Sequence, residues 1–293
     1  MHILFIGYGK TSERVAKQLF EQGHQISTIS QSPKTDSFAT HLIQDVHTLD
    51  LSAIAPIDWV YVLLSPKQSG VEAYQHTYLD SVQPIVTALK SHPVKRIVVV
   101  SSTRVYGQNA GESVDDETEI YPNDVQGEIL HQMEQVYLAA YPEQCTIIRP
   151  SGIYGVSVAR MQKMAASMTS YPNLHWSNRI HIEDLSRFLA QMIHVEHPDS
   201  SYILTDNQPK LLHEILQWFQ QQLGLPLLQV ESEEITGKKL YATRMQKMGF
   251  ELEHPDCYED YLELMEKIIS PKLPLKREES TSFSKEELGE DFI

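Results

Sequence analysis

Two glycines and a small polar residue near the start of the chain form a pattern that binds phosphate groups. Residues 7–12 read Gly-Tyr-Gly-Lys-Thr-Ser, between an apolar, β-rich segment at 3–6 and a segment at 13–20 with apolar side chains at helical spacing. In such a strand–turn–helix unit, Gly7 permits the tight turn and Gly9 lets backbone N–H groups approach a pyrophosphate. Ser12 replaces the glycine that usually packs helix on strand. The pattern predicts that a dinucleotide binds at Gly7, Tyr8, Gly9, Lys10, Thr11 and Ser12.

Other reactive residue types form weaker patterns. His194 and His197 have the spacing of one helix face, but no third ligand accompanies them, so we interpret them as a surface helix end and predict no metal site. Methionines 161, 164 and 168 also repeat at helical spacing; packing is the favoured interpretation, and a pocket wall is the alternative. The chain has no Gly-x-Ser-x-Gly elbow and no evident Ser-His-Asp set, which leaves hydrolase chemistry without support.

The composition narrows the class of protein. A chain of 293 residues can form one large α/β domain with a smaller lobe, and a hydrophobic fraction of 41% is ordinary for a packed protein. The net charge of −15 argues against a nucleic-acid partner, because phosphate backbones require a basic face. No apolar run approaches the ~20 residues of a membrane span, no export signal is visible, and the two cysteines lack ligand or disulfide spacing. We therefore expect a cytoplasmic protein with no membrane partner.

Strand and helix patterns alternate along the first half of the chain, as in a doubly wound parallel sheet. Strand-like segments follow at 25–30, 41–45, 59–64, 96–101 and 145–150, with helical patterns at 74–89 and 125–141. After Pro150, helices are expected at 158–170, 182–195, 210–223 and 258–269, and a strand at 201–205. We expect a Rossmann-type α/β domain over 1–155, completed by parts of 176–206, and a mainly substrate-binding lobe over 156–270.

The end of the chain has a different composition. Six acidic residues lie between positions 278 and 293, against Lys285 alone: Glu278, Glu279, Glu286, Glu287, Glu290 and Asp291. This segment lacks a pattern that could form a core, so residues 271–293 are predicted to be a flexible acidic tail. The alternative is a partner-docking peptide that ends in Asp291-Phe292-Ile293.

Several segments, in order, resemble one family. Residues 100–107 (Val-Ser-Ser-Thr-Arg-Val-Tyr-Gly) are similar to the end of the fifth strand in extended short-chain dehydrogenase/reductases, the NAD-dependent epimerase/dehydratase family. Residues 148–155 resemble the exit of the sixth strand, and 178–185 resemble the stretch that closes the substrate pocket. Later landmarks follow at 202–209, 238–239 and 249–250. The resemblance covers roughly residues 1–270, and it implies a Rossmann fold that binds NAD or NADP.

The resemblance also implies which residues contact the cofactor. Beyond the glycine turn, these are Ser30, Gln31, Asp45, Leu64, Ser65 and Ser101. Asp45 stands where the family has an acid beside the adenine, although it could equally cap a loop. The second strand ends without the acid that binds the ribose hydroxyls of NAD and without the arginine that binds NADP. Lys34 and the nearby serines could serve NADP, so the choice between NAD and NADP stays open.

The family's catalytic Tyr-x-x-x-Lys pair is missing. Aligning Gly127 and Glu134 with the residues that flank this pair places Gln126 at the Tyr position and Leu130 at the Lys position. An amide cannot transfer a proton and leucine has no ammonium, so the usual acid–base step is lost, while the upstream Ser102 is retained. This combination resembles the atypical branch of the family. The substitute donor considered first is Tyr121, followed by Tyr106, Glu128 and His131.

Two functions remain open on these grounds. The first is an oxidoreductase or epimerase that acts on a small molecule of nucleotide-sugar type, with Ser102 orienting the reacting oxygen. Its substrate would be bound by Tyr106, Arg149, Arg179 and His181. The second is a catalytically silent dinucleotide sensor or regulatory scaffold, which the loss of the Tyr–Lys pair favours. The oligomeric state is also open, with a homodimer as one candidate.

Overall fold

The computed structural model describes residues 1–269 and is built around a seven-stranded parallel sheet. Its strands lie in the order β12-β7-β5-β4-β1-β2-β3, and every neighbouring pair is parallel. Their bounds are β1 His2–Ile6, β2 Gln25–Ser30, β3 Thr40–Ile43, β4 Trp59–Val62, β5 Arg96–Val100, β7 Cys145–Pro150 and β12 Ser201–Leu204. The central strands are apolar runs buried on both faces, as a sheet covered by helices requires. The predicted Rossmann-type α/β fold is confirmed.

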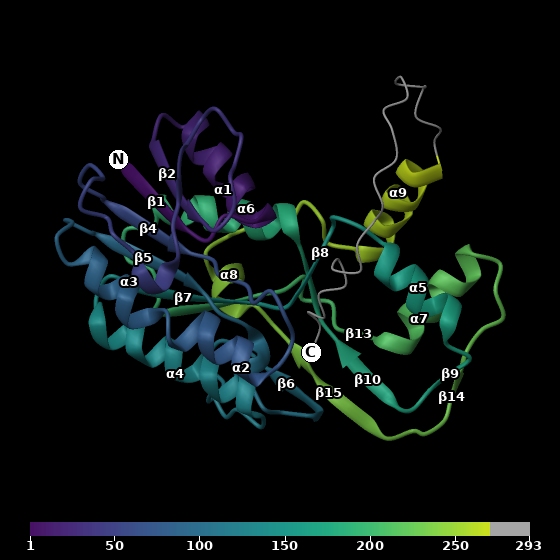
Figure 1. Cartoon of the computed structure of the whole chain (residues 1–293). Helices are drawn as coiled ribbons and strands as arrows, with labels where there is room; N and C mark the ends of the chain where they lie inside the picture. Colours follow the sequence, from purple (N-terminus) through teal and green to yellow (C-terminus); the bar gives the residue numbers. More distant parts are fainter. Residues whose placement is uncertain (270–293) are drawn as a thin grey trace.

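Helices cover both faces of this sheet (Figure 1). Helices α1 (Lys10–Glu21) and α6 (Ile182–Gln191) pack together on one face, while α3 (Val82–Leu89) and α4 (Val125–Ala140) lie on the other. Apolar residues at helical spacing explain this packing: Val15, Ala16 and Leu19 of α1 are buried. The strand order reverses between β1 and β4, and in open α/β sheets this is the position where ligands bind, at the carboxyl ends of the strands.

The prediction of one continuous helix over 74–89 is wrong. The structure has α2 (Val71–Tyr74), a π-helical turn η2 (Gln75–Leu79) and then α3. Pro84 explains the interruption, because it has no N–H to donate to the carbonyl of Asp80 four residues earlier. The hydroxyl of Ser81 donates instead to the carbonyls of Thr77 and Tyr78, which satisfies part of the broken turn.

Most of the remaining elements build a second unit beside the sheet, whereas α8 packs on β12 and places Met245 in the main core. A four-stranded sheet has the order β13-β10-β15-β6, and a separate apolar cluster joins α5, α7 and α9. The bounds are β6 Ala110–Val114, β8 Gly152–Tyr154, α5 Ala159–Ser167, β9 Ser170–Tyr171, β10 Leu174–Ser177, β11 Arg179–His181, β13 Lys210–Leu211, α7 Leu212–Gln222, β14 Gln229–Val230, β15 Ile235–Leu240, α8 Thr243–Lys247 and α9 Cys257–Ile269, with short 3-10 turns η1 Val46–Thr48, η3 Thr103–Val105 and η4 Met192–His194.

The structure bears to a different extent on the predicted domain division, the predicted tail and the expected lack of a membrane span. The division into a domain and a lobe stays a prediction, although the two separate apolar clusters are compatible with it. The predicted tail, 271–293, lies outside the described residues. Within residues 1–269, no helix is long and apolar enough to cross a membrane.

Candidate functional site

The turn after β1 lies at the point where the strand order reverses. Gly7 has a φ of +89°, and a Cβ there would overlap the backbone carbonyl of Leu63 at the end of β4. The N–H of Gly7 donates to the carbonyl of Ile29 at 3.0 Å. The buried hydroxyl of Ser12 donates to the Gly7 carbonyl at 2.9 Å, which ties α1 to the turn in place of a third glycine. Gly7 is therefore required by the fold itself.

Gly9 differs from Gly7 because nothing in the protein requires it to be glycine. Its backbone angles, φ −101° and ψ −167°, are open to any residue, and a Cβ would meet no atom within 4 Å. Gly9 caps α1, and within the described residues no side chain accepts a hydrogen bond from the N-terminal N–H groups of that helix. An exposed helix N-terminus beside open space is a site for an anion. The turn therefore fits the pyrophosphate of a dinucleotide.

A second feature fits the same ligand. Ser101 follows β5 at the same edge of the sheet; its hydroxyl is buried, and it has no hydrogen-bond partner among residues 1–269. A buried hydroxyl without a partner costs free energy unless a ligand or water satisfies it. Leu64 and Ser65 follow β4 and lie between the glycine turn and Ser101 in strand order, although the structure does not test their contact with a cofactor.

On the other side of the turn, the residues expected near the ribose and adenine contact one another. Asp45 caps η1 by accepting from the N–H and Nδ1 of His47 at 2.9 and 2.8 Å, and the amide of Gln31 donates to its other oxygen at 3.4 Å. These bonds from the His47 N–H and ring hold the pKa of Asp45 below its usual value. The Ser30 hydroxyl is committed to the Ser32 carbonyl. Asp45 is exposed, and its role beside the adenine stays a prediction.

Lys34 lies over the ring of Tyr8, with its Nζ 5.9 Å from the ring centroid. Tyr8 belongs to the glycine turn and is buried, and burial together with nearby Asp36 raises the pKa of its hydroxyl. An ammonium group is thus held beside the turn, on the side of β2, whose carboxyl end carries no acid. This is the side where a 2′-phosphate would distinguish NADP from NAD.

Helix α4 carries the positions aligned with the missing catalytic pair. Its first turn is fixed by Asp124, which accepts from the N–H of Gly127 at 2.7 Å. Gln126 is partly exposed, and Leu130 lies one turn later, buried in the main apolar core. Ser102 precedes this helix on the fifth strand's exit and caps η3 by accepting from the Arg104 N–H at 3.2 Å. The alignment of Gln126 and Leu130 with the Tyr–Lys pair is not tested by these contacts.

The substitute donors occupy different surroundings. Tyr121 is 73% exposed, and its backbone forms a bridge with Tyr106. Glu128 is exposed and accepts a hydrogen bond from Gln132 at 2.9 Å. His131 is partly buried, and its Nδ1 is buried without a hydrogen-bond partner among the described residues. Tyr121 therefore remains the candidate that solvent and ligands reach most easily.

Arg149 and Tyr106, predicted to contact substrate, belong to a buried network. The guanidinium of Arg149 donates to Glu134 at 2.8 Å and to the Tyr106 hydroxyl at 2.9 Å, and the carboxylate side chain is fully buried. Burial alone would lower the pKa of Arg149, but Glu134 and Tyr106 hold it above its usual value. Burial raises the pKa of Tyr106, against the effect of Arg149. The geometry favours a structural role for this pair; their role in substrate binding is untested.

Arg179, also predicted to contact substrate, is 5% exposed and donates to the hydroxyl of Tyr261 at 2.9 Å. Asp206 lies nearby; burial raises its pKa to about 6, against the opposing effects of the Gln208 N–H and Arg179. The Asp206 N–H donates to the Arg179 carbonyl at 2.7 Å. Arg179 thus connects β11 to α9 from within the protein.

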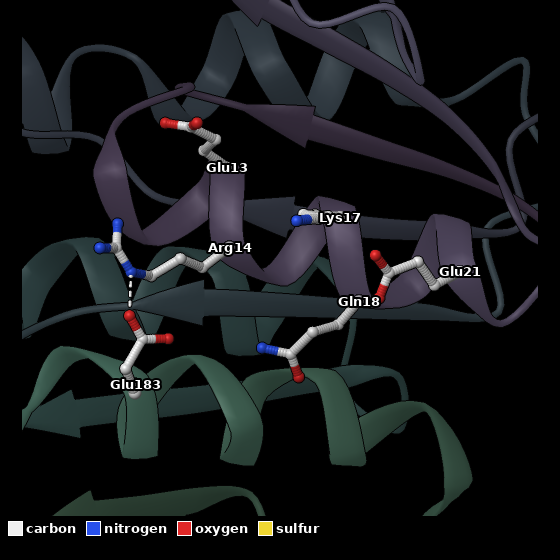
Figure 2. Close-up of a pocket in the computed structure, with 6 residues that line it drawn as sticks. All are labelled: Glu13, Arg14, Lys17, Gln18, Glu21 and Glu183. Atoms are coloured by element: carbon white, nitrogen blue, oxygen red, sulfur yellow. Dashed lines mark hydrogen bonds and ion pairs between the residues drawn. The ribbon is translucent and has the colours of Figure 1, made fainter.

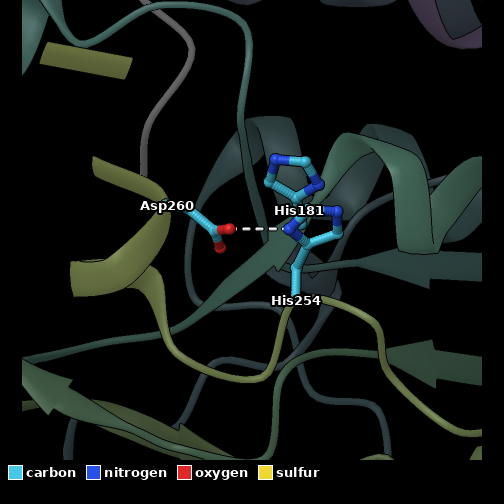
Figure 3. A group of neighbouring side chains, drawn as sticks. All are labelled: His181, His254 and Asp260. Carbon is cyan, nitrogen blue, oxygen red and sulfur yellow. Dashed lines mark hydrogen bonds and ion pairs between the residues drawn. The ribbon is translucent and has the colours of Figure 1, made fainter. Parts of the chain in front are cut away.

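His181, the last predicted substrate contact, belongs to a cluster that sequence reasoning missed. Its ring stacks on His254, with centroids 3.6 Å apart and planes at 24° (Figure 3). His254 Nδ1 lies 2.6 Å from Asp260, whose other oxygen accepts from Tyr154 at 2.5 Å. Buried Asp184 holds the loop by accepting from the N–H groups of Glu253 and His254. The cluster joins β8, β11 and α9, and we refer to Tyr154, His181, His254 and Asp260 as the histidine clasp.

Three residues of the histidine clasp, His181, His254 and Asp260, offer ligand atoms within 4.8 Å of one another, but their geometry does not suit chelation. A metal must lie near the plane of each imidazole that binds it, and two rings stacked face to face cannot share one. The Nδ1 of His181 also accepts from the N–H of Glu183 at 3.3 Å, which leaves the proton on Nε2. We interpret the cluster as a connection between elements.

A polar groove of about 400 Å³ lies apart from the glycine turn, on the outer surface where α1 meets α6 (Figure 2). An ion pair between Arg14 and Glu183 at 2.6 Å crosses it, and charges of both signs line it. His194, earlier considered with His197, lies elsewhere and contacts the amide oxygen of Gln22 at 3.1 Å. Neither feature adds a residue to the site at the carboxyl ends of the strands.

Comparison with known proteins gives matches over most of the chain. Residues 7–196 match the family of NAD(P)H-binding proteins. Protein YeeZ from Escherichia coli K12 is 27% identical over 214 residues, which cover 71% of this chain and 75% of the relative.

Solved structures share the fold over most of the chain. A protein of Methylobacillus flagellatus assigned to the NAD-dependent epimerase/dehydratases superposes with a TM-score of 0.78 at 29% identity, over 92% of this chain and 99% of the other. MoeE5, solved with UDP-glucose and NAD, gives 0.75 at 16% identity over 92% and 100%. The UDP-glucuronic acid 4-epimerase of Bacillus cereus, solved with NAD, gives 0.74 at 14% identity over 92% and 99%. The last two likenesses show the fold alone.

Proposed function

The chain belongs to the family of NAD(P)H-binding proteins, and from that premise we propose that it is an oxidoreductase or epimerase of the atypical extended short-chain dehydrogenase/reductase type. It binds NAD or NADP across the glycine turn and acts on a small molecule of nucleotide-sugar type. The observation that carries the proposal is Gly9, where open space meets an uncapped helix N-terminus. The unpartnered Ser101 hydroxyl supports it from the neighbouring strand.

The residues of the chain have distinct roles in this proposal. The dinucleotide, when bound, supplies hydride exchange with the substrate. Ser102 orients the reacting oxygen through its hydroxyl, and Gln126 holds it by a hydrogen bond but cannot exchange a proton with it. Tyr121 is the proposed proton donor, because a phenol can transfer a proton and this one is accessible. Leu130 lies in the core and contributes no charge.

The second candidate is a catalytically silent dinucleotide sensor or regulatory scaffold. It is favoured by one specific observation: an amide and a buried leucine stand at the positions aligned with the catalytic pair. Both candidates place the protein in the cytoplasm, with a dinucleotide domain over 1–155 and a substrate lobe over 156–270. A homodimer is proposed for either.

Hydride transfer separates the two candidates. The protein is incubated with NAD or NADP and with UDP-glucose or UDP-glucuronic acid, and reduced nicotinamide is followed by its absorbance while sugar products are followed by chromatography. The enzyme proposal expects turnover that falls at least tenfold in Tyr121→Phe, with unchanged dinucleotide affinity. Tight dinucleotide binding without product supports the sensor. Activity that appears only in the double variant Gln126→Tyr, Leu130→Lys further supports the sensor over the enzyme.

A further inference from the structure

Lys238 brings an ammonium group from the second unit to the carboxyl end of β5. It lies on β15, which pairs with β6 (Figure 1). The side chain is half-buried, and its Nζ donates to the backbone carbonyl of Tyr106 at 2.5 Å. One carbonyl satisfies only one of the three N–H groups of an ammonium. Among residues 1–269, Lys238 forms no ion pair with a carboxylate.

A second cation lies in the same place. Arg104, in η3, donates through Nε to both oxygens of Asp124, at 3.0 and 3.1 Å. The same carboxylate accepts from the N–H of Gly127 as the cap of α4. Arg104 is thus paired with Asp124, whereas Lys238 lies within electrostatic range of Asp124 and Glu112 but forms no ion pair with either. Both cations lie near the start of α4, where the helix dipole adds to their positive charge.

The surroundings of Lys238 favour an additional anion. Burial lowers the pKa of its ammonium; Asp124 and Glu112 oppose the effect, whereas Arg104 adds to it. A partly buried cation in such surroundings gains more from an anionic ligand than an exposed one does. The neighbouring Lys239 lies differently, with its Nζ 5.4 Å over the ring of Trp176. The two lysines are therefore adjacent in sequence but differ in their contacts.

The two cations flank the residues assigned to chemistry. Ser102 accepts from the backbone N–H of Arg104, and Gln126 follows Asp124 by two positions in the first turn of α4. We propose that Lys238 and Arg104 together bind an anionic group of the substrate, a phosphate or a carboxylate, beside Ser102 and Gln126. This inference rests on the proposed function and names the charge of its substrate. In the bound state, the N–H groups of the Lys238 ammonium that do not donate to the Tyr106 carbonyl donate to the anion.

The test compares Lys238→Met with the matched control Lys239→Met. Each protein, saturated with NADH, is titrated calorimetrically with inorganic pyrophosphate, UDP-glucose and UDP-glucuronic acid. Loss of one charged donor is expected to weaken binding about 10- to 100-fold in Lys238→Met alone. A loss for all three probes identifies a phosphate site, whereas a loss only for UDP-glucuronic acid identifies a carboxylate site. Affinity should also fall with added salt in the wild type.

Two outcomes overturn the inference. Equal affinities in the wild type and Lys238→Met, or no binding of any of the three probes to the wild type, would refute it. A wild type that binds no dinucleotide refutes the proposed function instead, and the NADH titration shows this separately. If Lys238→Met does not fold, acetylation of wild-type lysines is followed by mass spectrometry. UDP-glucuronic acid should then protect Lys238 and leave Lys239 unchanged; lack of protection counts against the site.

Discussion

Replacing Gly9 with valine should remove dinucleotide binding while leaving the fold intact. The backbone at Gly9 is extended, and a Cβ there meets no protein atom within 4 Å, so valine adds no internal clash. Its methyl groups would enter the space that the pyrophosphate needs above the start of α1. Valine is a poorer helix cap than glycine, which costs about 0.5–1 kcal/mol of stability.

The expected loss of binding affinity follows from the hydrogen bonds that the valine side chain prevents. Backbone N–H groups that donate to a charged phosphate contribute about 1.5–3 kcal/mol each. Losing two of them weakens the dissociation constant by two orders of magnitude or more. Gly7→Ala should behave in the opposite way: a positive φ and an overlap with the Leu63 carbonyl together cost about 3 kcal/mol in folding.

The assay pairs NADH and NADPH titrations, followed by calorimetry, with thermal unfolding of the same samples. Gly9→Val should unfold near the wild-type temperature and bind neither dinucleotide, whereas Gly7→Ala should unfold many degrees lower. A folded Gly9→Val protein with unchanged affinity would show that the pyrophosphate lies elsewhere. A Gly7→Ala protein as stable as the wild type would refute the steric argument for the turn.

Three further predictions concern specificity, pH and stability. NADPH should bind more tightly than NADH, because the Lys34 ammonium lies over Tyr8 of the glycine turn, on the side where a 2′-phosphate would be bound. Lys34→Ala should weaken NADPH binding about fivefold in a titration and leave NADH binding unchanged; equal affinities of the wild type for the two dinucleotides would contradict this. Burial, followed by the nearby His254, lowers the pKa of His181 in the folded protein. Below about pH 6.5 the unfolded chain therefore binds more protons than the folded protein, and the free energy of unfolding should fall as the pH drops. His181→Asn, which can still cap α6, should flatten that decline in denaturant titrations from pH 7 to 5; an unchanged slope places the effect elsewhere. Glu134→Gln should cost about 3 kcal/mol in chemical unfolding, because Arg149 is left buried without its carboxylate, and a loss below about 1 kcal/mol would contradict it.

Local patterns were sufficient to predict the sheet and the glycine turn. Strands such as β1 and β4 are short apolar runs, and the turn depends on Gly7 and its immediate neighbours. The break between α2 and α3 was missed because the apolar spacing continues across it, although Pro84 was a usable signal. The burial of side chains could not be predicted from local patterns. An arginine such as Arg149 is a residue type that often binds anionic substrates, and only its ion pair with buried Glu134 shows that it is bound within the protein.

The contacts of the histidine clasp and of Lys238 could not be predicted for a different reason, although residues 238–239 and His181 were noted in the sequence. His254 and Asp260 meet His181 through a loop and α9 that lie about seventy residues later, and no local spacing signals that contact. Lys238 reaches η3 only because β15 pairs with β6. Such arrangements arise from tertiary packing, so a single sequence without a fold cannot reveal them.

The place of β12 in the sheet has a consequence for how the chain folds during synthesis. β7 is buried along its whole length and pairs with β12 only after some fifty intervening residues, most of which build the second unit. Until Ser201–Leu204 has emerged, β7 is an open edge with unpaired backbone groups and apolar side chains, which favours aggregation. Fragments that stop before residue 201 should therefore collect in inclusion bodies, and the rate of sheet closure should reflect this long-range pairing rather than local helix formation.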